Sequence, residues 1–280
     1  MSLPPGAGDA VQIGGGDINQ AWRVRLADGR VAFVKTRPDA GEGEYEREAA
    51  ALGWLAQPGA LQVPQVLDVG PDYLALQWVE HGSLDQAGAR ELGSGLARLH
   101  AAGAPAFGDP GLGGMGGRSV VGSLSLPNDP APDWPTFYSQ RRLIPALAAA
   151  IERGGISASG ARAVEAVCER IAELCGPAEP PARLHGDLWS GNVLADVRGR
   201  PWLIDPTAYG GHREIDLAML RLFGAPSPLI FDAYEEVSPL AEGWRRRVPL
   251  YQLLPLLVHA ALFGGSYGAA AERAALQSLG

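Results

Sequence analysis

The feature that most constrains the fold of this chain is a change of hydrophobic pattern near residue 81. Before it, apolar and polar residues alternate in short runs, and Asp28-Gly29 lies between two such runs as in a hairpin turn. After it, apolar residues recur mainly at helical spacing. The sequence therefore predicts an α+β, bilobal protein, with a small β-rich lobe at 1–80 and a larger, mainly helical lobe at 81–280.

The individual elements follow from the same patterns. In the first lobe we expect strands within 11–36 and 63–80, and one helix at 42–56 that ends before Pro58-Gly59. In the second lobe the apolar run 201–204 predicts a short strand, and helices are expected at 88–102, 137–153, 157–175, 213–223 and most of 227–275. Residues 103–136 are dense in Gly and Pro and predict a long loop, of a kind that is usually functional or mobile.

Composition and charge limit the partners. The formal net charge of -8 disfavours binding to nucleic acid or to acidic membranes, whose phosphates repel it on average. The N-terminus lacks a signal-peptide pattern and no run reaches the roughly 18 apolar residues of a membrane span, so we expect a cytoplasmic protein. Cys168 and Cys175 lie about 10 Å apart along a predicted helix, too far for a disulfide, and are expected to be buried apolar residues.

The strongest chemical signal is the stretch LHGDLWSGNVL at 184–194. Asp187 and Asn192 have the spacing of the catalytic loop of protein kinases, and Asp205 follows the predicted strand thirteen residues after Asn192. An Asx-rich turn would explain the first two residues but not the third. Mg²⁺ binds hard oxygen ligands, so Asn192 and Asp205 are predicted to hold Mg²⁺ and Asp187 to accept the proton of the attacking hydroxyl.

A second group of residues predicts a site for the ATP phosphates. Gly14-Gly15-Gly16 joins the first two expected strands, where backbone N-H groups can approach an anion, although taken alone the three glycines favour a plain hairpin turn. Lys35 ends a strand, and in protein kinases such a lysine pairs with a helix glutamate and holds the α and β phosphates. We expect Glu48 to be that partner, because Glu44 and Glu46 lie nearer the helix start, where the dipole alone favours acids.

These motifs together resemble the fructosamine kinase (ketosamine 3-kinase) family, a branch of the protein-kinase-like fold shared with aminoglycoside phosphotransferases and choline kinases. HGDLWSGNVL and IDPTAYGGHREIDLAML carry the likeness, and GGGDINQAWRV, FVK and DWPTFYSQRRLIPAL add weaker matches. The resemblance implies ATP- and Mg²⁺-dependent phosphorylation of the sugar 3-hydroxyl of ketosamines. The unstable 3-phosphate would then be lost and the amine released, which is deglycation.

The resemblance also implies roles for further residues. Trp189 would stack on the sugar or on its amine, although a core tryptophan is the plainer interpretation. His212 and Glu214 would lie at the sugar pocket, and Asp216 would be structural, bonding the catalytic-loop backbone or capping a helix. Many family members have Cys where this chain has Asp17. The linker that binds adenine would comprise Gln77, Trp78, Val79 and Glu80.

The acceptor is expected to be small. Only eleven residues separate Asp205 from Asp216, which leaves no room for a segment that docks a peptide, so we expect a small ketosamine or a glycated lysine projecting from a protein. An alternative is a kinase of the same fold that acts on an aminoglycoside or amino alcohol. A non-catalytic ATP-binding module is a third interpretation, disfavoured because the predicted base, metal ligands and lysine are all present. A monomer and a homodimer both remain open.

Overall fold

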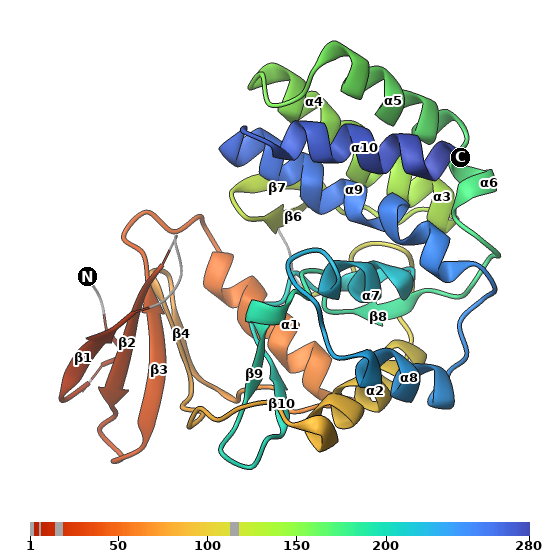
Figure 1. The fold of residues 1–280 in the computed structure, drawn as a ribbon. Coiled ribbons are helices and arrows are strands. Elements are labelled where there is room, and N and C mark those ends of the chain that lie inside the picture. The colour runs from red at the N-terminus through yellow and green to blue at the C-terminus, as the bar shows by residue number, and fades with distance from the viewer. Residues whose placement is uncertain (1–2, 6, 15–18, 113–117) are drawn as a thin grey trace.

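The computed structural model describes residues 3–5, 7–14, 19–112 and 118–280. A small sheet near the N-terminus lies beside a larger part that is mainly helical, and one helix connects them (Figure 1). The predicted α+β class is therefore confirmed. The division of the chain into domains at residue 80 stays a prediction.

The N-terminal sheet has five antiparallel strands in the order β1-β2-β3-β5-β4. The hairpin turn expected at Asp28-Gly29 joins β2 to β3, and there Gly29 has a φ of 85° and its N-H donates to the Leu26 carbonyl. That expectation is confirmed. The strands are β1 Ala10–Ile13, β2 Gln20–Arg25, β3 Val31–Thr36, β4 Val66–Gly70 and β5 Tyr73–Gln77.

Helix α1, Glu44–Ala56, packs into two different cores. Its side chains Tyr45 and Leu52 are buried against the sheet, in one cluster with Leu74 and Leu76. Trp54 and Leu55 at its C-terminal end belong to another cluster, formed largely by helix α2, Gln86–Ala101, and helix α8, Pro228–Val237. One end of α1 is therefore part of the N-terminal lobe and the other end is part of the helical lobe.

The helical lobe confirms the predicted helices but divides the longer ones. The segment predicted at 157–175 breaks at Arg170, and the segment at 227–275 breaks after Val237 and again at Gly264, which has a φ of 63°. The remaining helices are α3 Trp134–Phe137, a π-helix at Tyr138–Leu143, α4 Ile144–Glu152, α5 Ala158–Glu169, α6 Ile171–Leu174, α7 Glu214–Leu220, α9 Trp244–Phe263 and α10 Tyr267–Leu279.

The expectation of one long loop at 103–136 is wrong, because the segment contains a β-hairpin. Strands β6, Arg118–Val121, and β7, Leu124–Pro127, pair around Gly122, which has a φ of 61°. Leu124 and Leu126 anchor this hairpin in the main helical core. Four-residue strands in a stretch rich in glycine give too little alternation to be recognised in the sequence.

Two more antiparallel pairs of short strands frame the predicted catalytic loop. Strand β8, Ala182–Leu184, pairs with β11, Tyr209–Gly211, and β9, Val193–Ala195, pairs with β10, Pro201–Leu203. The predicted strand at 201–204 is thus confirmed as β10. The other three were not predicted, since three residues carry no measurable periodicity.

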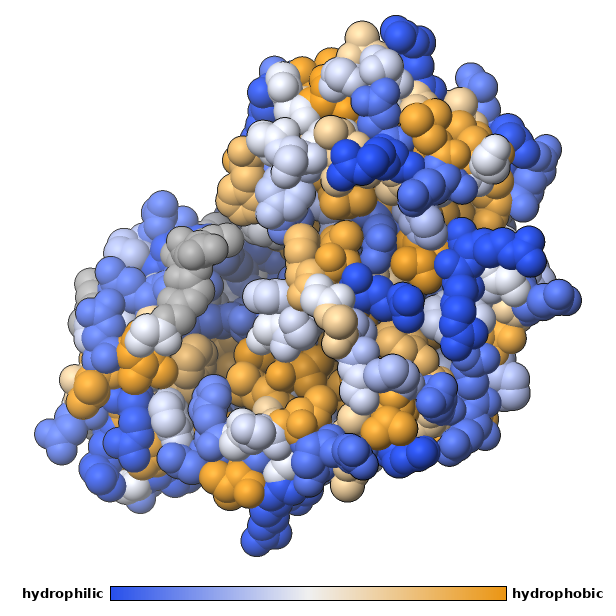
Figure 2. All heavy atoms as spheres, in the orientation of Figure 1, coloured by the Kyte–Doolittle hydropathy of each residue, from blue (hydrophilic) through white to orange (hydrophobic). Residues whose placement is uncertain are grey.

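The molecular surface is hollowed between the two lobes, and hydrophobic residues line part of that hollow (Figure 2). Cys168 and Cys175 are both free thiols, as expected. The expected burial is confirmed for Cys175 and wrong for Cys168, which is half-buried. In the described part of the chain, no helix is both long and apolar enough to cross a membrane.

Candidate active site

The backbone of the segment that follows β8 is held by hydrogen bonds to the Asp216 side chain. One carboxylate oxygen of Asp216 accepts from the His185 N-H at 2.7 Å, and the other accepts from the Gly186 N-H at 2.9 Å. Gly186 has a φ of 84°, and a Cβ there would lie 2.4 Å from the Thr207 carbonyl oxygen. The backbone just before Asp187 is therefore tightly fixed, which supports the predicted structural role of Asp216.

A buried histidine, His100, completes this support and was not found in the sequence. Its Nε2 lies 3.2 Å from the Asp216 carboxylate and its Nδ1 lies 2.8 Å from the Tyr234 hydroxyl. Burial alone would raise the pKa of Asp216, but hydrogen bonds from His100 and the Gly186 N-H, together with the charges of His100 and His185, outweigh burial and lower it. An ionised carboxylate only accepts, so Nε2 of His100 carries a proton, and Nδ1 accepts from the Tyr234 hydroxyl whenever the ring is neutral.

Asp187 and Asn192 contact each other across the loop, as their spacing predicts. The Asn192 side-chain N-H₂ donates to the Asp187 carbonyl at 2.8 Å and to its carboxylate at 3.2 Å. Both hydrogens of the amide are thereby used, so its oxygen is directed elsewhere. Burial raises the pKa of the Asp187 carboxyl above its usual range, although Asn192 and nearby histidines oppose that shift. A raised pKa makes a carboxylate a stronger base.

Lys35 is 5% exposed and lies between two carboxylates. Its ammonium forms an ion pair with Glu48 and another with Asp205, the latter at 3.0 Å. Of the three acids considered, Glu48 is therefore the partner, whereas Glu44 pairs with Arg37 and Glu46 is exposed. Burial lowers the pKa of Lys35, but the two carboxylates outweigh it and raise the pKa, so the amine stays charged.

Asp205 and Asn192 fit the requirements of a Mg²⁺ site. The side chain of Asp205 is 49% exposed, and this residue is the one non-glycine residue among those described that has a positive φ, at 53°. It lines the same cavity as Asn192. The described residues contain no group of three His, Cys, Asp or Glu side chains suited to a metal. A cation here would complete its shell with water and phosphate oxygens, as Mg²⁺ commonly does.

A cavity of about 490 Å³ lies between the sheet and the helical lobe. Its predicted lining residues include Gly14, Lys35, Gln77, Trp78 and Val79. Glu80 is not among them, and its carboxylate instead accepts from the Trp78 indole N-H at 2.8 Å. Gly15, Gly16 and Asp17 lie outside the described residues. Several apolar wall residues were missed because their pattern matches that of ordinary core residues: Ala21, Phe33, Leu76, Leu194 and Ile204.

Trp189 stands at the edge of this cavity and begins a chain of ring contacts. It is 38% exposed and packs edge-on against Phe223 at 6.2 Å between ring centroids. Phe223 contacts His259 at 5.1 Å, and His259 contacts Phe263 and Tyr267 at 5.5 and 5.0 Å. We call these five residues the aromatic cluster. Phe263 is 64% exposed, so the cluster has an open side.

His259 was not found in the sequence, because nothing near it marks it as part of a site. Its Nδ1 lies 2.7 Å from the Pro255 carbonyl oxygen, which can only accept. Nδ1 therefore carries a proton, and Nε2 is an acceptor whenever the ring is neutral. Through Phe223, His259 joins the ring contacts that begin at Trp189, two residues after the predicted base.

The structure does not place His212 and Glu214 at the cavity. His212 is buried and stacks on Tyr251 with 5.3 Å between centroids, and burial lowers its pKa to about 4. Glu214 is buried and forms an ion pair with Arg247 at 2.6 Å. Neither residue lines this cavity or the second one described below. Their contacts are those of residues that join β11 and α7 to α9.

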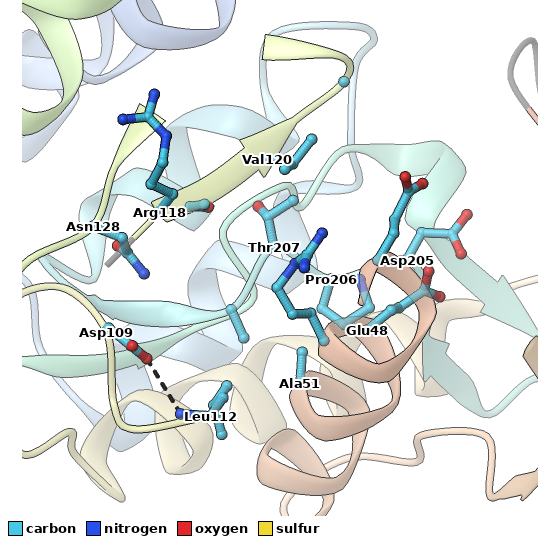
Figure 3. A pocket seen from close by; sticks show the side chains of 15 residues that line it. Glu48, Ala51, Asp109, Leu112, Arg118, Val120, Asn128, Asp205, Pro206 and Thr207 are labelled. Carbon is cyan, nitrogen blue, oxygen red and sulfur yellow. Dashed lines mark hydrogen bonds between the residues drawn. The ribbon is translucent and has the colours of Figure 1, made fainter. Parts of the chain in front are cut away.

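A second, smaller cavity of about 180 Å³ lies on the other side of Asp205. Figure 3 shows Glu48 and Ala51 of α1 on one side, Val120 of the β6-β7 hairpin on the other, and the segment 205–207 between them. Because Asp205 lines both cavities, its carboxylate stands where the two spaces meet.

Comparison with known proteins gives a consistent result. A family model described as fructosamine kinase matches residues 6–279. A protein of Thermus thermophilus named a probable ketoamine kinase is 38% identical over 268 residues, which cover 95% of this chain and 93% of that protein. The crystal structure of a Thermobifida fusca protein assigned as a fructosamine-3-kinase has a TM-score of 0.89 and 42% identity, covering 98% of this chain and 94% of the other.

A more distant structure shows the wider fold. A type I macrolide 2'-phosphotransferase is 18% identical with a TM-score of 0.65, covering 95% of this chain and 90% of the other chain. At that identity the likeness concerns the fold alone. The fold is the bilobal, protein-kinase-like one that the family resemblance implies.

Proposed function

Because this chain belongs to the fructosamine kinase family and is a kinase that acts on ketosamines, we propose that it transfers the γ-phosphate of ATP to the sugar 3-hydroxyl of small ketosamines in the cytoplasm. The product, a 3-phosphate, would then break down and release the amine. The observation that carries the proposal is the contact between Asp187 and Asn192, beside a cavity that Lys35, Trp189, Asn192 and Asp205 line.

The phosphates of ATP would be held by charges already assembled in the cavity. Lys35 is kept charged and oriented by Glu48, and it would contact the α and β phosphates. Asn192 and Asp205 would hold Mg²⁺, which when bound neutralises charge on the phosphate oxygens. For this, Asp205 must exchange its present partner Lys35 for the cation, and its half-exposed side chain allows that exchange.

Asp187 would act as the general base. Burial raises its pKa, and the Asn192 amide holds its carboxylate in place. It would orient the 3-hydroxyl and take its proton as the bond to phosphorus forms. The backbone of this loop is held by Asp216, so the base needs little reorganisation before it reacts.

The aromatic cluster is suited to the acceptor. A ketosamine contains a secondary amine that is cationic at neutral pH, and a cation binds favourably to the face of an indole such as that of Trp189. Within this cluster His259 has Nε2 available as an acceptor, where it could accept a hydrogen bond from a second sugar hydroxyl. A single exposed aromatic residue is ordinary, but contiguous rings beside a predicted base indicate a binding surface.

A panel of acceptors tests the proposal. Purified protein would be given ATP and Mg²⁺ with ribulose-lysine, fructose-lysine, erythrulose-lysine, a glycated protein, an aminoglycoside and an amino alcohol, and ADP release would be measured. We expect turnover with at least one free ketosamine, and a 3-phosphate that decomposes to free amine. Turnover with the aminoglycoside or amino alcohol and with no ketosamine would contradict the proposal. Turnover with glycated protein alone would contradict the preference for small acceptors.

A further inference from the structure

The C-terminal end of α1 is bound by a residue from a distant part of the chain. Arg183, in the middle of β8, donates from Nη1 to the Trp54 carbonyl at 2.6 Å and to the Gln57 side-chain oxygen at 3.1 Å. Its Nε donates to the Gly103 carbonyl at 3.3 Å. The partners of this guanidinium are carbonyl and amide oxygens rather than carboxylates.

The contact satisfies a need of the helix itself. The carbonyls of a last helical turn lack intrahelical donors and carry partial negative charge, which a cation stabilises. The last turn of α1, all of it described, contains no basic residue of its own. Arg183 supplies that cation from another segment, and its guanidinium also lies over the Trp54 ring, 4.4 Å from the ring centroid. The helix end is thus held by charge, hydrogen bonds and stacking at once.

Arg183 connects the two halves of the predicted catalytic machinery. Strand β8 continues directly into the loop that carries Asp187, four residues after Arg183. Glu48 lies six residues before Trp54 on α1, or about 9 Å along the helix axis. One guanidinium therefore fixes the helix that holds Lys35 to the strand that holds the base.

We propose that Arg183 is a positioning residue that keeps α1 docked on β8, so that the Lys35–Glu48 pair stays in register with the catalytic loop whether or not ligand is bound. In protein kinases the corresponding helix moves, and its position controls activity. Here the C-terminal end of α1 is packed into the helical lobe through Trp54 and Leu55 and is fastened by Arg183. The enzyme would be permanently assembled, without a switch at this helix.

The test is a double-mutant cycle on nucleotide affinity, which rests on the proposed roles of Lys35 and Glu48 but needs no ketosamine. Binding of Mg-ADP would be measured by calorimetry for the wild type, Arg183→Ala, Glu48→Gln and the double variant. We expect Arg183→Ala to raise Kd about tenfold in the wild-type background and less than about twofold in the Glu48→Gln background, because Arg183 acts through Glu48. Ketosamine KM should change little.

Matched variants separate this role from a general loss of stability. Arg170→Ala removes an exposed arginine of the same lobe and should leave Kd unchanged. Arg183→Lys keeps the charge but loses the flat group over Trp54, and should raise Kd about threefold; this variant decides the matter if Arg183→Ala does not fold. The proposal is overturned if Arg183→Ala raises the Kd for Mg-ADP by the same factor in the wild-type and Glu48→Gln backgrounds. It is also overturned if Arg183→Ala and Arg183→Lys both bind Mg-ADP with the wild-type Kd. Absence of ketosamine turnover would concern the proposed function and leave this result intact.

Discussion

At the scale of single residues, the catalytic loop illustrates how polar contacts set chemical character. Asp187 is half-buried and Asp216 is fully buried, yet the pKa of Asp187 is raised and that of Asp216 is lowered. Asp216 accepts from two backbone N-H groups and from His100, which stabilise its charge, whereas the main neutral donor to Asp187 is one amide. Asp187 is therefore suited to accept a proton, whereas Asp216 stays ionised and holds the loop.

Replacing the predicted base tests this assignment. Asp187→Asn keeps the shape of the side chain but cannot accept a proton, so we expect the rate of phosphoryl transfer to fall by about 10² or more. Affinity for Mg-ADP should stay within about twofold of the wild type. Asp232→Asn, which changes an exposed carboxylate on α8, is the control and should keep full activity. Equal rates for Asp187→Asn and the wild type would show that another group is the base.

His259 offers a second test at this scale. His259→Phe keeps an aromatic ring among Phe223, Phe263 and Tyr267 but removes Nε2. Loss of one hydrogen bond of about 0.5–1.5 kcal/mol should raise ketosamine KM about two- to tenfold. The KM for ATP should not change, because His259 does not line the nucleotide cavity. A rise in both KM values would argue against a contact with the acceptor alone.

At the scale of elements, buried ion pairs join segments that the sequence separates. Glu214 at the start of α7 binds Arg247 of α9, and Arg213 binds Glu179 ahead of β8. These contacts explain why the GHRE segment looked like part of a site. It contains three polar or charged residues in succession, but their partners lie inside the helical lobe.

Stability measurements separate these structural pairs from surface pairs. Glu214→Gln leaves Arg247 without its buried partner, and we expect a loss of about 3–5 kcal/mol in the free energy of unfolding. Arg90→Ala, which breaks the exposed pair with Glu236, should cost less than about 1 kcal/mol. Urea unfolding followed by tryptophan fluorescence measures both. Similar small losses for the two variants would contradict the structural role of Glu214.

The turn between β9 and β10 should make stability depend on pH. Asp196 accepts from the Arg198 and Arg200 backbone N-H groups and from the Arg200 side chain. Burial opposes these contacts, but they lower the pKa of Asp196 to about 2, below its unfolded value of about 3.9. Its contribution is therefore fully present above about pH 4 and is lost as the pH falls towards 2.

The Asp196→Asn variant measures this effect. Its free energy of unfolding should lie below that of the wild type at pH 6, and the gap should shrink between about pH 4 and pH 2. The control Asp232→Asn should follow the wild type over the whole range. A gap for Asp196→Asn that is constant with pH would show that the carboxylate charge is not what stabilises the turn.

At the scale of the whole molecule, α1 and the cavity make nucleotide binding a property of both lobes. The cavity takes residues from the sheet, from the segment 77–79 and from the catalytic loop. A ligand that binds there stabilises the folded chain according to its concentration and affinity, by about 2.7 kcal/mol at 100 times Kd.

Removal of the metal tests the predicted ligands at this scale. We expect ADP with Mg²⁺ to raise Tm clearly, and ADP with EDTA to raise it much less, because Asp205 and the phosphates then repel each other. The variant Asp205→Asn should lose most of the difference between the two conditions. An equal rise in Tm with and without Mg²⁺ would contradict a metal held by Asn192 and Asp205.

The sequence by itself determined the order of β-rich and helical parts and the spacing of Asp187, Asn192 and Asp205. Such features depend on the alternation and periodicity of apolar residues and on the geometry of short segments. All of these are determined by residues that are close together in the sequence. It also indicated Glu48 rather than Glu44 or Glu46, because the helix dipole alone accounts for acids near the start of a helix.

Only the tertiary structure decided the contacts between distant segments. His100, Arg183 and His259 have ordinary surroundings in the sequence, and each gains its role from a partner that packing brings near. The opposite holds for His212 and Glu214. They were expected at the sugar pocket, but packing buries both of them inside the helical lobe. The physical reason is the same in both cases: whether a side chain meets solvent, a ligand or another side chain depends on which surfaces the whole chain buries.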